Sequence, residues 1–137
     1  MISLIIPCIP EHLDPLENIL TDYTYNTVIP TQTIISLSNT KTVSKDIVDS
    51  LYNRFKDKLT EFTIIATPEL LNRADNRNKG FSYAKYDIVT FSDADDRAHH
   101  QRIETILYFF NKYNIDCLLH SYSLKKCVEA NNNPNHC

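Results

Sequence analysis

Short apolar runs alternate with helical patterns along this chain. The apolar runs at residues 2–6, 33–37, 62–66, 88–91 and 117–119 predict β-strands. Between them, apolar residues recur at the spacing of one helix face, first at Leu16, Ile19, Leu20 and Tyr23. Alternation of this kind predicts βαβ units, and therefore an α/β fold with a mainly parallel sheet flanked by helices.

The helices can be placed by their caps and their apolar faces. Asp14 followed by Pro15 predicts the start of the first helix, and Ser44 is expected to cap the second. The second helix carries an apolar stripe that we assign to the core: Ile47, Val48, Leu51, Phe55 and Leu59. A short helix is expected within residues 72–85, and a further one carries Ile103, Ile106, Leu107 and Phe110.

In sheets of this kind, ligands bind beyond the carboxyl ends of the strands. The loops that follow the first, second and fourth predicted strands are therefore the places to look for chemistry. Pro7 is expected to end the first strand, Ser38 begins the polar turn after the second, and the fourth strand runs directly into Asp93.

Composition narrows the class of protein. The chain has 137 residues, of which 42% are hydrophobic, enough for one domain with its own core. A formal net charge of -3 argues against a nucleic-acid partner, because phosphate backbones select basic surfaces. No apolar run is long enough to span a bilayer. Cys8, Cys117, Cys127 and Cys137 lack the spacing of a disulfide framework, which favours reduced thiols and a cytoplasmic protein.

Acidic residues cluster directly after the fourth predicted strand, in the run Asp93-Ala94-Asp95-Asp96. Carboxylates this close repel one another, and a bound divalent cation removes that repulsion. Mn²⁺ and Mg²⁺ prefer hard oxygen ligands and often share their coordination shell with substrate phosphates. The alternative is a solvated turn in which one Asp caps the helix that follows near His100.

A basic stretch precedes the fourth strand. Arg77 and Lys79 bring positive charge close in sequence to the acidic run. The planar fork of an Arg can bind a pyrophosphate, although a solvated basic loop would have the same composition. Gly80 is the single glycine of the chain. Since only Gly adopts a positive φ angle without steric cost, we expect such an angle at this position. The alternative is an ordinary glycine at a helix end or a turn.

Taken together, these residues resemble a known family. The order Arg77-Asn78-Lys79-Gly80, then Ala84, Asp87, Val89 and Phe91, then the acidic run, is similar to family 2 glycosyltransferases of the GT-A fold. The opening Ser3-Leu4-Ile5-Ile6-Pro7 is similar to the first strand of that family, and Gln101-Arg102-Ile103-Glu104 stands where the family begins a helix. The resemblance covers about residues 1–120 and implies a Rossmann-like fold that binds nucleotide-diphospho-sugars.

The resemblance implies roles for the three loops. The nucleotide-sugar would be bound by residues from all of them: Pro7, Cys8, Ile9, Ser38, Asn39, Arg77, Asp93, Ala94 and Asp95. The loop from Pro7 to Ile9 would lie against the nucleoside, Arg77 would contact the nucleotide, and Asp93 would face the ribose or the sugar. The family usually has a carboxylate after its second strand to bind the base, whereas this chain has Ser38 and Asn39, which could hydrogen-bond a base edge.

A metal ion is also implied by the resemblance. Asp95 and Asp96 would hold Mn²⁺ or Mg²⁺ on the diphosphate, and the ion would act as a Lewis acid that stabilises the leaving nucleoside diphosphate. The implied reaction is an inverting, metal-dependent transfer of a sugar from a UDP- or GDP-sugar to an unknown acceptor.

The acceptor half of the family pattern is not recognisable. Direct displacement needs a base, and the late carboxylates Asp116 and Glu129 match no base motif of the family. We therefore expect a donor-binding domain over residues 1–125 and an Asn-rich tail over residues 126–137, in a chain that is truncated or is completed by an oligomer or a partner chain. The alternative is a non-catalytic module that binds a nucleotide-sugar or a partner.

Two other classes of α/β enzyme are disfavoured. A phosphatase-like phosphotransfer domain needs an Asp nucleophile after the first strand, where this chain has Pro7-Cys8-Ile9-Pro10. A dinucleotide enzyme needs a glycine-rich phosphate turn in the same place. Cys127, His136 and Cys137 include residue types that bind zinc, but their spacing fits no standard zinc pattern.

Overall fold

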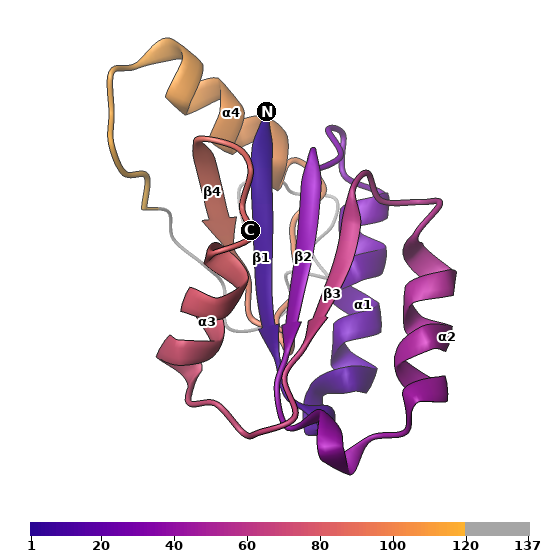
Figure 1. Cartoon of the computed structure of the whole chain (residues 1–137). Helices are drawn as coiled ribbons and strands as arrows, with labels where there is room; N and C mark the ends of the chain where they lie inside the picture. Colours follow the sequence, from indigo (N-terminus) through magenta and orange to yellow (C-terminus); the bar gives the residue numbers. More distant parts are fainter. Residues whose placement is uncertain (120–137) are drawn as a thin grey trace.

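A computed structural model gives the fold of residues 1–119; residues 120–137 are not described. Parallel strands form a 4-stranded sheet in the order β3-β2-β1-β4: β1 (Ile2–Cys8), β2 (Gln32–Leu37), β3 (Phe62–Ala66) and β4 (Ile88–Phe91). The helices are η1 (Pro10–His12), α1 (Leu13–Thr24), η2 (Thr40–Thr42), α2 (Lys45–Phe55), α3 (Arg73–Phe81) and α4 (Arg102–Lys112). The predicted α/β fold with a parallel sheet flanked by helices is confirmed (Figure 1).

The two faces of the sheet are covered by different helices. Every residue of the central strand β1 is buried. Its even-numbered residues, such as Leu4, share the main core with Leu20 of α1, Leu51 of α2 and Ile103 of α4. On the opposite face Ile5 meets α3, which is seen in front of the sheet in Figure 1. Because successive side chains of a strand point to opposite faces, a continuous apolar run suits a strand that is covered on both.

Pro7 does not end β1, contrary to the sequence prediction. The strand continues beyond it, and Pro7 pairs with Ser36 in the register between β1 and β2. In a parallel strand, successive residues direct their backbone groups to opposite neighbouring strands, so residues two apart face the same neighbour. Ile5 O faces β4, because it accepts a hydrogen bond from Ser92 N, which follows that strand. The nitrogen of Pro7 faces that same side, beyond the last pair with β4. Its missing N–H therefore removes no hydrogen bond from the sheet.

Helix starts were predicted with mixed success. Ser44 caps α2 as expected, because its side chain accepts a hydrogen bond from Ile47 N. Asp14 does not cap α1. The helix begins at Leu13, one residue before Asp14, because η1 has already turned the chain there. Ile47 heads the predicted apolar stripe of α2 but is exposed, since the buried part of this helix lies further along, at Leu51 and Phe55.

The predicted strand at residues 117–119 is absent from the structure. Those residues are described and form no regular element, and the side chain of Leu119 is 90% exposed. A strand needs a neighbour to pair its backbone groups. Within residues 1–119, β4 pairs only with β1, and no segment pairs with its outer edge.

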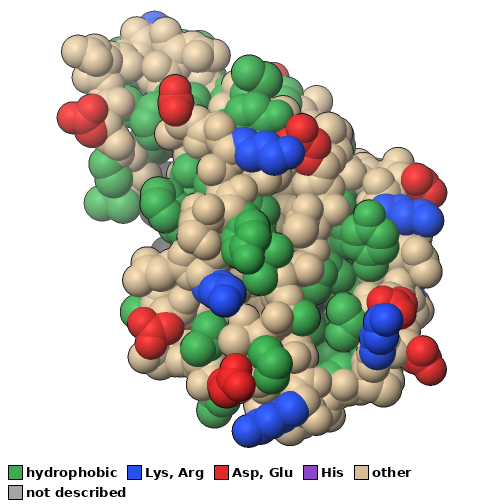
Figure 2. Space-filling model, in the orientation of Figure 1, with side chains coloured by type: hydrophobic (Ala, Val, Ile, Leu, Met, Phe, Trp, Pro, Cys, Tyr) green, Lys and Arg blue, Asp and Glu red, His purple; other side chains and the backbone are tan. Residues whose placement is uncertain are grey.

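The loop between α3 and β4 is tied to the sheet by a buried amide. Gln32 Oε1 accepts hydrogen bonds from Ser3 Oγ (2.7 Å) and Lys85 N (2.9 Å), and Gln32 Nε2 donates to Tyr83 O (3.0 Å). Lys85 Nζ also lies 3.8 Å from Glu61 Oε1. Over the face of the molecule drawn in Figure 2, acidic and basic side chains are scattered among polar and hydrophobic ones. No helix within residues 1–119 is long and apolar enough to cross a membrane.

Candidate functional site

The carboxyl ends of β1, β2 and β4 lie at one edge of the sheet, as parallel strands require. Ser38 N donates to Cys8 O at 3.0 Å, so the loops after β1 and β2 touch. The short helices that follow these two strands, η1 and η2, both lie at the lower end of the sheet in Figure 1. The acidic run Asp93-Ala94-Asp95-Asp96, called the acidic loop below, follows β4 on the same edge.

Helix α3 is fixed to these strand ends by Asn76. The side chain of this residue is 3% exposed and uses both ends of its amide. Nδ2 donates to Cys8 O at 3.2 Å, and Oδ1 accepts from Ser36 Oγ at 2.7 Å. A single buried side chain therefore joins α3 to β1 and to β2, and it stands next to Arg77 in the sequence.

Gly80 lies one turn after Asn76, on the same face of α3. Its φ angle is not positive, so the conformational reason expected from the sequence is wrong. The requirement is steric: a Cβ atom on Gly80 would lie 2.7 Å from Ile5 Cγ2 and 3.3 Å from Ser36 Cβ. The helix packs so closely on the sheet that any side chain at this position would have to displace a strand residue.

Arg77 joins the basic stretch to the acidic loop. Its Nη2 atom lies 2.7 Å from Asp93 Oδ1, and the two side chains are 38% and 32% exposed. At that exposure the pair contributes little to stability by itself. The main effect of the ion pair is to hold the Arg77 guanidinium beside the carboxylates that follow β4. Arg77 Nε is buried and has no hydrogen-bond partner among residues 1–119.

The acidic loop turns tightly over a buried alanine. Asp96 N donates to Asp93 O at 3.1 Å, Ala94 is buried in the core, and Asp95 and Asp96 are exposed. Burial raises the pKa of Asp96 above its ordinary value, and the neighbouring carboxylates of Asp93 and Asp95 raise it further. The loop therefore carries concentrated negative charge that Arg77 neutralises only at Asp93.

The end of β1, together with the loops after β1 and β2, provides an uncharged floor. Pro7, Cys8 and Ser38 are buried, whereas Ile9 and Asn39 are partly exposed above them. Asn39 has a φ angle of 58°, a left-handed conformation that Asn tolerates better than most residues. Burial, with the negative charge of Glu11 adding to it, raises the pKa of the Cys8 thiol to about 12. Cys8 is therefore a packing residue and not a nucleophile.

The arrangement of these elements matches the pattern of one family. The sequence model of glycosyl transferase family 2 matches residues 3–137. This chain belongs to that family. The resemblance recognised in the basic stretch and the acidic loop is confirmed, and no curated protein sequence matches the chain significantly.

Solved structures share the fold of this chain. S. aureus TarS 1-349 has a TM-score of 0.69 at 15% identity, over 82% of this chain and 33% of that chain. Its complex with UDP-GlcNAc has a TM-score of 0.67 at 15% identity, over 82% and 32%. Mannosyltransferase PcManGT from Pyrobaculum calidifontis, in complex with GDP-Man and Mn²⁺, has a TM-score of 0.55 at 20% identity, over 70% and 28%.

These likenesses confirm the GT-A fold of this family 2 member. At 15–20% identity they show the fold alone. The chain spans 19–33% of the length of five similar solved chains, the three above among them. The sequence boundary drawn at residue 125 between domain and tail falls outside the described residues, as do Cys127, Glu129, His136 and Cys137.

The carboxylate oxygens of the acidic loop suit a hard cation. Within residues 1–119, no three His, Cys, Asp or Glu side chains converge into a metal-binding group. Mg²⁺ and Mn²⁺ are commonly bound by one or two carboxylates together with substrate phosphates. Asp95 and Asp96 supply two exposed carboxylates of this type, so the residues present fit such an ion.

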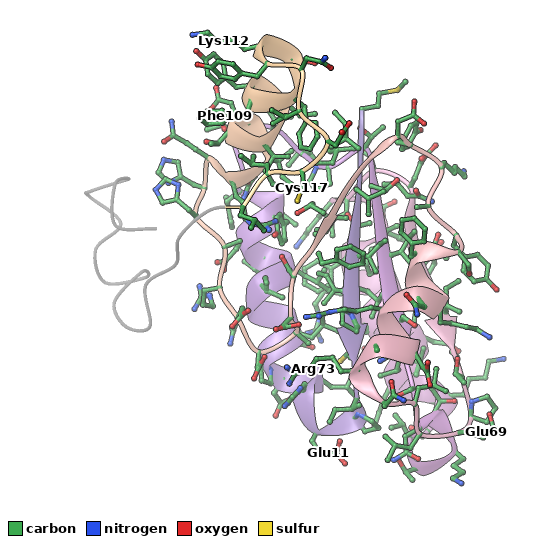
Figure 3. All side chains as sticks on the ribbon, turned by 90° about the vertical axis from the view of Figure 1, so that its left-hand side faces the viewer. Glu11, Glu69, Arg73, Phe109, Lys112 and Cys117 are labelled. Atoms are coloured by element: carbon green, nitrogen blue, oxygen red, sulfur yellow. The ribbon has the colours of Figure 1, made fainter. Side chains whose placement is uncertain are left out.

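Sequence reasoning missed two charged residues that lie near the site. The charge of Glu11 in η1 acts on Cys8 together with that of Asp95, and the charge of Arg73 in α3 acts on Asp96. Figure 3 shows Glu11 and Arg73 in the lower half of the molecule. Two signals could have found them: Glu11 follows the first strand, and Arg73 stands four residues before Arg77, on the same helix face.

Proposed function

We propose that this family 2 glycosyltransferase binds a UDP- or GDP-sugar at the carboxyl ends of β1, β2 and β4, with Mn²⁺ or Mg²⁺ between the diphosphate and the acidic loop. The observation that carries the proposal is the 2.7 Å contact between Arg77 and Asp93, which unites the basic stretch and the acidic loop in one site. Family membership supports sugar transfer as the class of reaction. The solved relatives in complex with UDP, UDP-GlcNAc, and GDP-Man with Mn²⁺ support the class of donor.

The nucleoside would lie over the uncharged floor. Ile9 and Asn39 are the partly exposed residues there, and the Asn39 side chain offers both a donor and an acceptor to a base edge. Pro7, Cys8 and Ser38 would support them from below. The Ser38 hydroxyl is buried without a hydrogen-bond partner in the described part of the chain, so Ser38 belongs to the support of the floor and not to its exposed surface.

The diphosphate would lie between the two sets of charges. Arg77 keeps donors beyond the one it gives to Asp93, and a guanidinium can bind phosphate oxygens through a planar fork. Arg73 adds a second positive charge one turn earlier on α3. Asp95 and Asp96 would bind the metal ion, and Asp93, with Ala94 beside it, would face the ribose or the sugar.

The metal would stabilise the leaving diphosphate as a Lewis acid when bound. The role of the protein at this step is to orient: Arg77 holds Asp93 in place, and buried Ala94 fixes the turn that presents Asp95 and Asp96. The uncharged floor keeps the nucleoside away from the acidic side chains.

Titration calorimetry with UDP and with GDP tests the proposal. At least one of the two should bind about tenfold more tightly, or better, in Mn²⁺ than in EDTA, because the ion removes the repulsion between phosphates and carboxylates. Adenosine diphosphate serves as a control for base selection by the floor. Equal affinities in Mn²⁺ and EDTA would contradict the role of the metal.

We also propose that residues 1–125 form the donor-binding domain, followed by a tail, and that the acceptor half is supplied from outside these residues. Alone, the chain should then transfer little sugar to an acceptor, since loss of a general base costs about 10²- to 10⁴-fold. Slow hydrolysis of the donor could remain, because water needs no acceptor pocket. The alternative is a module that binds the donor without transfer.

A donor-consumption assay with and without a panel of sugar acceptors distinguishes these possibilities. Slow consumption that acceptors do not accelerate supports a donor-binding domain that needs a further half, and no consumption supports the binding module. Rapid consumption that depends on an acceptor would show that the chain contains its own base. Asp116 and Glu129 would then be the first carboxylates to replace.

A further inference from the structure

The acidic loop is held at both ends by consecutive residues of α1. Directly before the loop, Ser92 Oγ lies 2.5 Å from Tyr23 OH. Directly after it, Arg97 donates two hydrogen bonds to Asp22, from Nε to Oδ2 at 2.7 Å and from Nη2 to Oδ1 at 2.8 Å. One turn of α1 therefore fixes the residues on either side of the acidic loop, although they lie about seventy positions further along the chain.

The bonds before the loop form a connected network. Tyr23 is fully buried, and its hydroxyl also accepts a hydrogen bond from Arg102 Nη1 at 2.8 Å. Arg102 Nη2 donates to Phe91 O at 3.1 Å, and Ser92 N donates to Ile5 O at 3.1 Å. The chain thus enters the loop from a backbone that is fixed by the sheet, by α1 and by α4.

The bonds after the loop depend mainly on Asp22. Its Oδ2 atom accepts a hydrogen bond from Ala98 N at 3.0 Å in addition to the fork of Arg97. The Asp22 side chain is 14% exposed, whereas that of Arg97 is 40% exposed. Just beyond the end of α1, Asn26 Nδ2 donates to His99 O at 3.2 Å. A shielded carboxylate with three donors is therefore the principal anchor of residues 97–98.

Another ion pair on the same helix provides a contrast. Glu17 of α1 pairs with Arg54 of α2, and their side chains are 42% and 48% exposed. That pair joins two helices on the surface and touches no part of the acidic loop. Exposed pairs of this kind contribute little to stability, whereas a forked, shielded pair restricts geometry more strongly.

We propose that Asp22 is a positioning residue that holds the acidic loop, before any ligand arrives, in the shape that receives the cation and the diphosphate. This inference rests on the proposed function. The carboxylates of the loop repel one another, so the free loop would spread unless its ends were fixed. A loop that is already ordered loses less conformational entropy when it binds, and this difference appears as affinity.

Asp22→Asn tests this role, with Glu17→Gln as the matched control on the same helix. The first substitution removes the charge and one acceptor of the fork while keeping the shape of the side chain. Calorimetry with UDP or GDP, whichever wild type binds more tightly, should show affinity about tenfold weaker in Mn²⁺ and unchanged in EDTA. Glu17→Gln should change neither value. Equal weakening in both solutions, or none, would overturn the positioning role.

A second measurement needs no ligand. In the free protein, amide hydrogen exchange over residues 93–98 should be about tenfold faster in Asp22→Asn than in wild type, with exchange in α1 unchanged. Arg97→Lys keeps the positive charge but loses the fork, so hydrogen exchange of the same amides should also be faster. The double variant Asp22→Asn with Arg97→Lys should exchange little faster than either single variant, because both changes remove the same interaction. Unchanged exchange in both variants would refute the positioning role, whereas failure of wild type to bind UDP or GDP would refute the proposed function.

Discussion

The loops that follow β1 and β2 and the segment from α3 to the acidic loop meet at one edge of the sheet but expose different groups. The first region rests on Pro7, Cys8 and Ser38, which solvent does not reach. The second presents charged groups, Arg77 and Asp95 among them, that solvent does reach. Buried side chains set the shape of a site through packing, whereas exposed charges contribute little to folding and are available to a ligand.

This contrast separates stability from binding within a single site. Substitutions in the buried region, or at the face of α3 that joins it, should change the free energy of unfolding. Substitutions among the exposed charges should change the affinity for a nucleoside diphosphate and leave folding nearly intact. The experiments below test that division from the largest expected effect to the smallest.

The chemical inertness of Cys8 should give the largest effect. Its thiol pKa is about 12 instead of the ordinary 9.0, so the thiolate population at pH 8 falls about 1000-fold relative to the unfolded chain. Alkylation of Cys8 by iodoacetamide, followed by peptide mass spectrometry, should be at least that much slower in the native protein than in urea. Cys117, which is exposed, is the internal control and should react readily in both. Rapid native labelling of Cys8 would show that the floor is open.

Asp95→Ala should weaken Mn²⁺-dependent binding of UDP or GDP by about 100-fold, because it removes one of two proposed metal ligands. Asp57→Ala is the matched control, since Asp57 is also exposed and lies in the turn after α2. Both variants should show the circular dichroism and melting temperature of wild type. Equal affinities for the two variants would remove Asp95 from the site.

Asn76→Ala should destabilise the fold by about 2 kcal/mol, because it removes two buried hydrogen bonds and leaves Ser36 Oγ and Cys8 O without those partners. Asn78→Ala, an exposed Asn on the same helix, should change stability by less than about 0.5 kcal/mol. Urea unfolding measures both. If the two variants unfold at the same urea concentration, the attachment of α3 through Asn76 is not a determinant of stability.

Gly80→Ala should give the smallest change, a net loss of about 1–2 kcal/mol, because the new methyl group would press on Ile5. In an exposed helix the same substitution is stabilising by about 1 kcal/mol, so the sign itself is the test. Thermal unfolding shows which effect is larger. A raised melting temperature would mean that the sheet can yield at Ile5.

Local patterns in the sequence determined most of the fold. Strand and helix periodicity placed β1 to β4 and the buried face of α1, because burial of an apolar face follows from spacing along a few turns or residues. The family of the chain could be inferred for a related reason: the basic stretch and the acidic loop are close in sequence and have a characteristic order. The fifth predicted strand failed because a strand also needs a partner, which no local pattern supplies.

Only the tertiary structure decided how the site is held together. Its key contacts join residues that are 40 to 75 positions apart in the sequence. They are made by Asn76, by Gly80, and by Asp22 with Arg97. Composition and spacing carry no information about which distant atoms meet, because that depends on the register of the sheet and the closeness of helix packing. Pro7 shows the same limit: its place inside β1 is possible only because β4 ends before reaching it.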